Sequence, residues 1–312
     1  MANPSTRKAL IATLSVAGIT VAFALAGWVS RRLFEQEAAP GVVASEPSRE
    51  RSLHPETDDR RFRVSGVQGS VSCDQAGQVS VLHAGDLLSL RDIISTPPGA
   101  RIILRRGQTE IEIRESLSVA VEQIEEEAAR FDVIDGSGRI HATVEGGNDR
   151  LTIGGEQTAA TNEGPSRWVV SRDASGKVAV AVKKGKIRFA SANAAVEVKE
   201  GQETSAEKNS PPIAPIDTME DLVLSVRWPE AAPGGAPVKL TGQTSPTANV
   251  TVDNQRVTVD PDGKFSATLS AGKAVEVRSQ DVLGREKSER GTVRAAGKAP
   301  KLTPTGEALW KQ

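Results

Sequence analysis

The chain has 312 residues and a formal net charge of −1, with 39 Lys and Arg residues against 40 Asp and Glu residues. Because nucleic-acid binding requires a basic face, this balance excludes a nucleic-acid partner. The single cysteine cannot form a disulfide within the chain, and the few aromatic residues disfavour surfaces that stack on sugars or bases.

An uncharged apolar run extends from Ala9 to Val29, between the basic pairs Arg7-Lys8 and Arg31-Arg32. As a helix it would be about 31 Å long, close to the hydrocarbon core of a bilayer at about 30 Å. We therefore expect a short cytoplasmic tail (1–8) and a single transmembrane helix (9–30) that acts as a signal anchor. The protein would then belong to a bacterial inner membrane, with most of the chain in the periplasm.

Two further expectations concern the same run. Ala24-Leu25-Ala26 has the small-residue pattern of a signal-peptide cleavage site, so the alternative is a cleaved periplasmic protein that starts at Gly27. Gly18, Ala22 and Ala26 fall four residues apart, a spacing that lets two helices approach closely. A weak homodimer through this helix face is therefore a further hypothesis.

A mainly β module follows a polar spacer. Residues 31–60 are rich in Glu, Pro, Ser and Arg, so we expect a disordered linker. Over 61–206, short runs of Val, Ile and Leu alternate with turns that contain Gly, Asp or Asn, which predicts a β-sandwich or roll. Within it, Ser175-Gly176-Lys177 and Lys184-Gly185-Lys186 each lie between two β runs and predict hairpins.

Several motifs of this module occur in an order that resembles a FecR domain. Its opening is matched by Gly66-x-x-Gly69-x-Val71, Gly85-Asp86-Leu87-Leu88 and Asp92-Ile93-Ile94-Ser95-Thr96, and the strand of Gly99–Gly107 follows. The resemblance covers 61–206 and implies a periplasmic, non-enzymatic module for sensing or interaction. FecR regulators also carry a cytoplasmic domain that handles a sigma factor. With eight residues ahead of the apolar run, we do not extend that role to this chain.

The C-terminal third is expected to form a second β module. Residues 207–220 contain three prolines and predict a stiff, extended linker. Residues 221–295 return to alternating β runs, and residues 296–312 are expected to be a disordered tail. The second module resembles the bacterial Ig-like repeat of extracytoplasmic proteins, which implies a small β-sandwich. The matching residues are Gly242, Thr244, Pro246, Ala248, Val250, Asp260, Asp262, Gly263, Phe265, Asp281 and Gly284.

Two sets of acidic residues raise the question of a cation site. The first belongs to Val121–Arg130, where the pattern leaves a helix and a continuing strand both open: Glu122, Glu125, Glu126 and Glu127. The second lies in the turns of the second module: Asp253, Asp260, Asp262 and Asp281. We interpret the first as a solvated face and the second as turn-forming residues, so no metal is expected. The three histidines (His54, His83, His141) show no ligand-like spacing.

The sequence contains no Gly-rich phosphate loop, His–Glu metal helix, nucleophile elbow or C-x-x-C pair. We therefore expect no catalytic residue, no cofactor and no enzymatic activity. The leading hypothesis is a membrane-anchored periplasmic adaptor or sensing protein, which binds an envelope protein through both β modules with residues that the sequence does not assign. The alternative is a module that binds a cell-wall polymer or glycan, and the third is a protein that signals across the membrane.

Overall fold

The computed structural model describes residues 60–229, 236–270 and 272–293. The expected cytoplasmic tail, transmembrane helix, spacer and C-terminal tail lie outside these residues. Within them no helix occurs, and therefore none that is long and apolar enough to cross a membrane. The prediction of a mainly β chain is confirmed for the described part.

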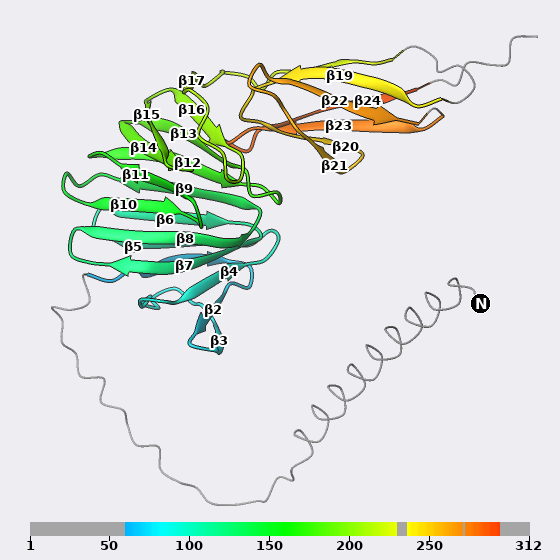
Figure 1. Cartoon of the computed structure of the whole chain (residues 1–312). Coiled ribbons are helices and arrows are strands. Elements are labelled where there is room, and N and C mark those ends of the chain that lie inside the picture. The colour runs from blue at the N-terminus through cyan, green and yellow to red at the C-terminus, as the bar shows by residue number, and fades with distance from the viewer. Residues whose placement is uncertain (1–59, 230–235, 271, 294–312) are drawn as a thin grey trace, which may run out of the picture. The chain divides into compact units, whose positions relative to one another are not determined.

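Strands β1 to β17 form two sheets (Figure 1). The eight-stranded sheet has the order β1 (Arg63–Gln68), β5 (Arg101–Arg106), β6 (Thr109–Arg114), β9 (Gly138–Val144), β12 (Ser166–Arg172), β13 (Val178–Lys184), β16 (Gln202–Ala206), β17 (Ile216–Asp217). The nine-stranded sheet has the order β15 (Ala194–Lys199), β14 (Lys186–Ser191), β11 (Thr158–Asn162), β10 (Arg150–Gly154), β8 (Ala128–Gly136), β7 (Leu117–Ile124), β4 (Ile93–Thr96), β2 (Ser72–Gln75), β3 (Gln78–Val81). Neighbouring strands are antiparallel except for the parallel pair β8–β10.

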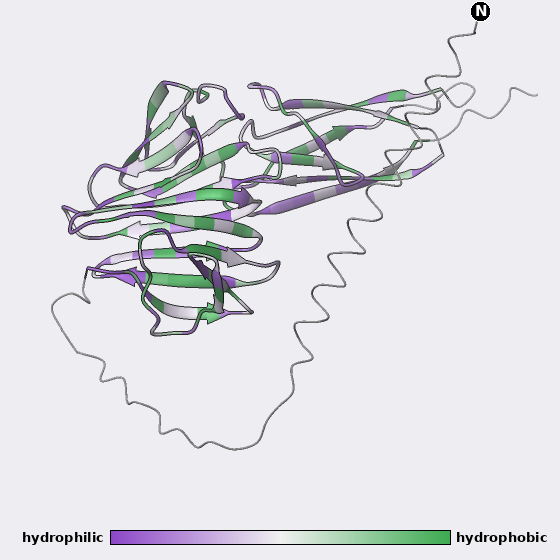
Figure 2. Ribbon diagram, turned by 60° about the horizontal axis from the view of Figure 1, so that its bottom comes forward, coloured by the Kyte–Doolittle hydropathy of each residue, from purple (hydrophilic) through white to green (hydrophobic). Residues whose placement is uncertain are grey.

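The two sheets share one apolar core. Alternation places every second side chain inside: β6 buries Thr109, Ile111 and Ile113, while the residues between them are partly exposed. Figure 2 shows the same alternation of apolar and polar residues along the strands. The rings of Phe62 and Phe131 meet edge to face at 5.0 Å between centroids, an arrangement that aromatic pairs prefer. This core belongs to a β-sandwich built almost entirely from aliphatic side chains.

Local predictions in the first module had mixed outcomes. Ser175-Gly176-Lys177 is the turn of the antiparallel pair β12–β13, as predicted. The hairpin predicted at Lys184-Gly185-Lys186 is wrong, because β13 and β14 belong to different sheets. Gly185 instead turns the chain from one sheet to the other at φ 77°, where an added Cβ would lie 2.4 Å from the Pro165 carbonyl oxygen. Residues 121–130 are strand on both sides of a turn, so the helical alternative does not apply.

Residues 221–293 form two smaller sheets. One has the order β18 (Leu224–Arg227), β19 (Val238–Thr244), β22 (Lys264–Leu269), and the other β21 (Gln255–Val257), β20 (Asn249–Val252), β23 (Ala274–Gln280), β24 (Glu286–Thr292). Phe265 is buried in their common core. Asp253 and Asn254 both have positive φ in the tight β20–β21 turn, and the Gly263 amide donates to the Asp260 carbonyl in the next turn. Both turns were predicted.

The segment expected as a stiff, extended linker, 207–220, lies against the first module. The Ile213 amide donates to the Ser205 carbonyl at 2.9 Å, and the Thr204 hydroxyl donates to the Ile213 carbonyl at 2.7 Å. The Ser191 hydroxyl donates to the Ser210 carbonyl, and β17 pairs with β16. Prolines fix an extended backbone, and here that extended backbone suits an added edge beside β16.

Candidate functional site

The structure brings two parts of the chain together at a polar junction between the first module (61–206) and the second (221–293). Glu203 on β16 is only 2% exposed. One of its carboxylate oxygens accepts hydrogen bonds from the hydroxyls of Ser245, at 2.8 Å, and Thr247. Both hydroxyls lie in the loop between β19 and β20. A buried carboxylate needs such donors, so the second module completes the environment of Glu203.

Lys177 makes the second polar contact, from the turn between β12 and β13. Its ammonium group is buried and donates to the carbonyl oxygens of Pro246, at 3.1 Å, and Ala248, at 3.3 Å. Burial lowers the pKa of Lys177, and the carboxylate of Glu207, 3.9 Å away, opposes that shift. The same loop of the second module is thus held by an acceptor, Glu203, and a donor, Lys177.

An ion pair and an apolar contact extend the junction. The guanidinium of Arg256 on β21 lies 2.8 Å from the carboxylate of Asp173, whose other oxygen accepts the Ser175 and Lys177 amides. Beside it, Val282 packs against Ala179 and Ala181 on the face of β13 turned away from the main core. The small side chains of that face leave room for the β23–β24 loop, which is a different loop of the second module from the one that Glu203 and Lys177 bind.

Gly284 shows how closely that loop approaches the first module. An added Cβ would lie 2.6 Å from the guanidinium carbon of Arg139, and the residue has φ +85°. The resemblance to Ig-like repeats picked out Gly284 and Asp281 as a turn, and Asp281 does accept the Arg285 amide. Nothing in the sequence indicated that this turn docks on a neighbouring module.

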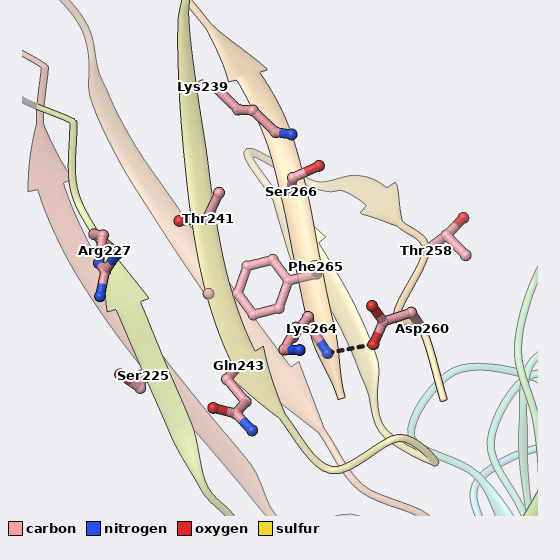
Figure 3. A pocket seen from close by; sticks show the side chains of 11 residues that line it. Ser225, Arg227, Lys239, Thr241, Gln243, Thr258, Asp260, Lys264, Phe265 and Ser266 are labelled. Atoms are coloured by element: carbon pink, nitrogen blue, oxygen red, sulfur yellow. Dashed lines mark hydrogen bonds between the residues drawn. The ribbon is translucent and has the colours of Figure 1, made fainter. Parts of the chain in front are cut away.

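A second feature is a hollow of about 570 Å³ on the outer face of the sheet β18–β19–β22 (Figure 3). Cross-strand pairing places Ser225, Gln243 and Lys264 in one row and Arg227, Thr241 and Ser266 in the next. Lys239 follows on the central strand, and Asp260, which accepts the Lys264 amide, lies at the rim. The face offers three cations and several hydroxyls, a donor set suited to anionic groups.

A third feature is a cleft of about 360 Å³ beside the ends of β8, β10 and β12. Val133, Ile134, Val170 and Val178 contribute apolar side chains to its lining. Glycines, uncharged polar residues and charged side chains of both signs form the rest, the charged ones being Glu122, Asp132, Glu156, Arg172 and Lys208. At about 360 Å³ the cleft lies at the lower end of the size range of small-molecule pockets.

Burial shifts the pKa of two titratable side chains. Burial, together with the nearby Asp92 carboxylate, raises the pKa of the Cys73 thiol to about 12, so the nucleophilic thiolate is scarce. Burial and the neighbouring Arg114 lower the pKa of His141 on β9 to about 4. His83 is exposed, and His54 lies outside the described residues. The described histidines lie on separate elements, as their spacing suggested.

Three of the aspartates in the second module stabilise the turns in which they lie by accepting backbone amides. Asp253 accepts the Glu276 amide, Asp260 accepts the amides of Asp262 and Lys264, and Asp281 also pairs with Arg285. The four glutamates of 122–127 are exposed. Across residues 60–229, 236–270 and 272–293, no three His, Cys, Asp or Glu side chains gather in a way that would hold a metal ion. The helix face of Gly18, Ala22 and Ala26 lies outside these ranges.

No protein-family model matches the sequence, and no curated protein matches it. Two crystal structures of a putative anti-sigma factor from Parabacteroides distasonis ATCC 8503, at 2.50 Å and 1.65 Å resolution, are similar at a TM-score of 0.35 and 12% sequence identity. Each match covers 40% of this chain and 59% of the other, so this chain spans less than two thirds of their length. A likeness at this level does not extend to function.

Proposed function

We propose that this chain is a membrane-anchored periplasmic adaptor without enzymatic activity, in which a FecR-like domain and an Ig-like domain bind an envelope protein as one body. The junction is the observation that carries the proposal. Glu203 and Lys177 both bind one loop of the second module, with Arg256 and Val282 beside it. Modules fixed in this way present one continuous surface, which suits recognition of a protein partner of matching shape.

The chemistry of the individual side chains also favours binding over catalysis. The Cys73 thiol has a raised pKa, and the turn aspartates spend their oxygens on backbone amides. The described hollows offer donors or apolar walls, not a nucleophile next to a base. These polar groups stabilise the fold, and the outer surfaces of the two modules remain available to a protein partner.

The test is capture with the full chain from detergent-solubilised envelope membranes, set against capture on purified cell wall. The adaptor proposal expects enrichment of specific membrane proteins by the wild type. Glu203→Ala/Lys177→Met, which loosens the junction while leaving the outer surfaces unchanged, should weaken that enrichment. Recovery of the chain with purified wall material and no protein partner would instead support the polymer-binding alternative, which the cationic face of β18–β19–β22 favours.

The membrane anchor is tested separately. A reporter that is active only outside the cytoplasm, fused after Gln312, should be active, and the full-length protein should stay with membranes after a carbonate wash. A soluble product that begins at Gly27 would contradict the anchor and support cleavage.

The signalling alternative is tested by replacing Ala9–Val29 with an unrelated membrane helix while keeping the flanking charges. The adaptor proposal expects partner binding and phenotype to survive this exchange. Loss of phenotype in a correctly localised and abundant variant would favour signalling through the helix, with Gly18, Ala22 and Ala26 as its contact face.

A further inference from the structure

Strand β3 is a sheet edge without the usual protection. Among the described strands it is the last of the nine-stranded sheet, and its one partner there is β2 (Figure 1). Its sequence, Gln78-Val79-Ser80-Val81, has no charge and no proline, and all four residues are exposed. Val79 and Val81 lie on the same face and are 67% and 51% exposed.

The other described sheet edges of this module are protected. β1 has a register shift between Val64 and Gly66, and residues 85–88 cover it through the Val64 amide and carbonyl. β15 carries the exposed charges of Glu197 and Lys199, and β17 is two residues long. Bulges, charges and short length are the means by which proteins prevent edge-to-edge pairing. Of these three features β3 has only the short length, so its exposed valines are available to a partner strand.

The hairpin geometry shows which backbone groups are available. Ala76 and Gly77 both have positive φ, so Gln75 and Gln78 flank a two-residue turn as a hydrogen-bonded pair. The pattern then alternates: Cys73 and Ser80 bond to each other, and the Leu82 amide donates to the Val71 carbonyl at 2.9 Å. The amides and carbonyls of Val79 and Val81 therefore point outward, away from β2.

We propose that a second copy of this chain occupies that edge, with its β3 antiparallel to the first. A two-fold axis at Ser80 places Val79 opposite Val81 of the second copy, and the two exchange both backbone hydrogen bonds. By symmetry, Val81 of the first copy pairs in the same way with Val79 of the second. All four outward-pointing backbone groups of each strand, the amides and carbonyls of Val79 and Val81, are then hydrogen-bonded. The strand carries no charge, so self-pairing brings no like charges together, and the exposed valines pack as cross-strand pairs. With only four residues a side, the association is weak.

The register makes this proposal testable by disulfide trapping of the full chain in detergent. Cys73 lies opposite Ser80 within the chain, so the background variant is Cys73→Ala. In the proposed register the two Ser80 Cα atoms are about 4.5 Å apart, within the range of a disulfide. Two Gln78 Cα atoms would be about 13 Å apart, since they are displaced by four residues. Ser80→Cys should thus form a dimer under mild oxidation, and Gln78→Cys should not.

A second measurement does not depend on the cysteine variants. Sedimentation velocity of the wild-type chain should show concentration-dependent dimerisation, and Val79→Lys/Val81→Lys should abolish it by placing charges on the edge. Equal trapping of Ser80→Cys and Gln78→Cys would reflect random collision and overturn the proposal. So would a wild type that stays monomeric and captures another protein through β3, since that result would assign the edge to a different partner.

Discussion

The carboxylate of Glu203 lies 2.8 Å from the hydroxyl oxygen of Ser245, although the two residues are 42 positions apart and belong to different modules. Thr247 donates to the same carboxylate oxygen. This contact makes the stability of the two modules interdependent, which gives the first prediction.

Glu203→Ala should lower the free energy of unfolding of the 60–293 fragment by about 1–3 kcal/mol, because it removes the carboxylate acceptor of two buried hydroxyls, which then have only their bond to each other. Urea denaturation measures the change. Ser245→Ala combined with Glu203→Ala should cost less than the sum of the single variants, since the two share one interaction. Glu127→Ala, at an exposed site, is the matched control. Strict additivity of the two changes would contradict the contact.

The second prediction concerns Phe265, which is 4% exposed in the core of the second module. Phe265→Ala should cost about 3–5 kcal/mol, the range for truncating a buried Phe. The exposed Met219→Ala should cost less than about 0.5 kcal/mol. A loss below about 1 kcal/mol for Phe265→Ala in urea denaturation would show that the ring does not support this core.

A substitution at Gly242 tests the position of the Phe265 ring in a second way. A Cβ added at Gly242 would lie 2.3 Å from the Phe265 ring and 2.7 Å from the Ser225 carbonyl oxygen. Gly242→Ala alone should therefore cost about 1–3 kcal/mol through overpacking. In a Phe265→Ala background the same change should cost less, because the nearer of the two clashes is gone. An equal cost in both backgrounds would place the strain at the Ser225 backbone alone.

The third prediction is a pH dependence that arises from His141. Burial lowers its pKa from the usual 6.5 to about 4, with Arg114, Lys183 and Arg139 acting in the same direction and Glu112 against it. The unfolded chain therefore binds a proton here between pH 6.5 and about 4, while the folded chain does not. The stability that neutral His141 provides is complete above pH 6.5 and is lost progressively as the pH falls toward 4.

Unfolding midpoints measured across that range check the sign. His141→Gln removes the titrating group, so its stability should fall less steeply than that of the wild type between pH 6.5 and 4. A His141→Gln profile parallel to that of the wild type would contradict the assignment.

The fourth prediction concerns Cys73. Its thiol is fully buried and its pKa is raised from 9.0 to about 12, which reduces the thiolate fraction near neutral pH about a thousandfold. A thiol reagent should therefore modify native protein at least a thousandfold more slowly than protein in denaturant. Comparable rates in the two conditions would show that Cys73 is exposed by local opening.

The sequence predicted those features that depend on a few neighbouring residues. Short runs of Val, Ile and Leu predicted strands over 61–206, and one of these strands, Thr109–Arg114, buries Ile111 and Ile113. The aspartates at 260 and 262 predicted a turn, which Asp260–Gly263 forms. Sheet membership is different, because it depends on strands far apart in the chain. Lys184-Gly185-Lys186 has the composition of a hairpin, yet it connects two sheets. The tight turn at Ala192-Asn193 was missed because neither residue is the glycine that usually marks positive φ.

The junction was beyond local prediction for the same reason. Gln202–Ala206 has the composition of an exposed polar strand, and Glu203 is buried there because a loop from the second module covers it. The turn that contains Lys177 was predicted, but its ammonium group donates to the carbonyls of Pro246 and Ala248, which lie 69 and 71 positions further along the chain. Buried charges at a domain contact carry no periodicity of their own.

The strand order also constrains the order of folding events. Glu203 lies on β16, and β16 is held by β13 on one side and by β17 on the other. The surface on which the second module docks therefore forms only after the C-terminal strands of the first module have joined their sheet. Since a chain is synthesised from its N-terminus, the strands of the first module must assemble before the second module has a surface to dock on. Refolding from denaturant should accordingly end in a docking phase, slower than the collapse of either core and lost in Glu203→Ala.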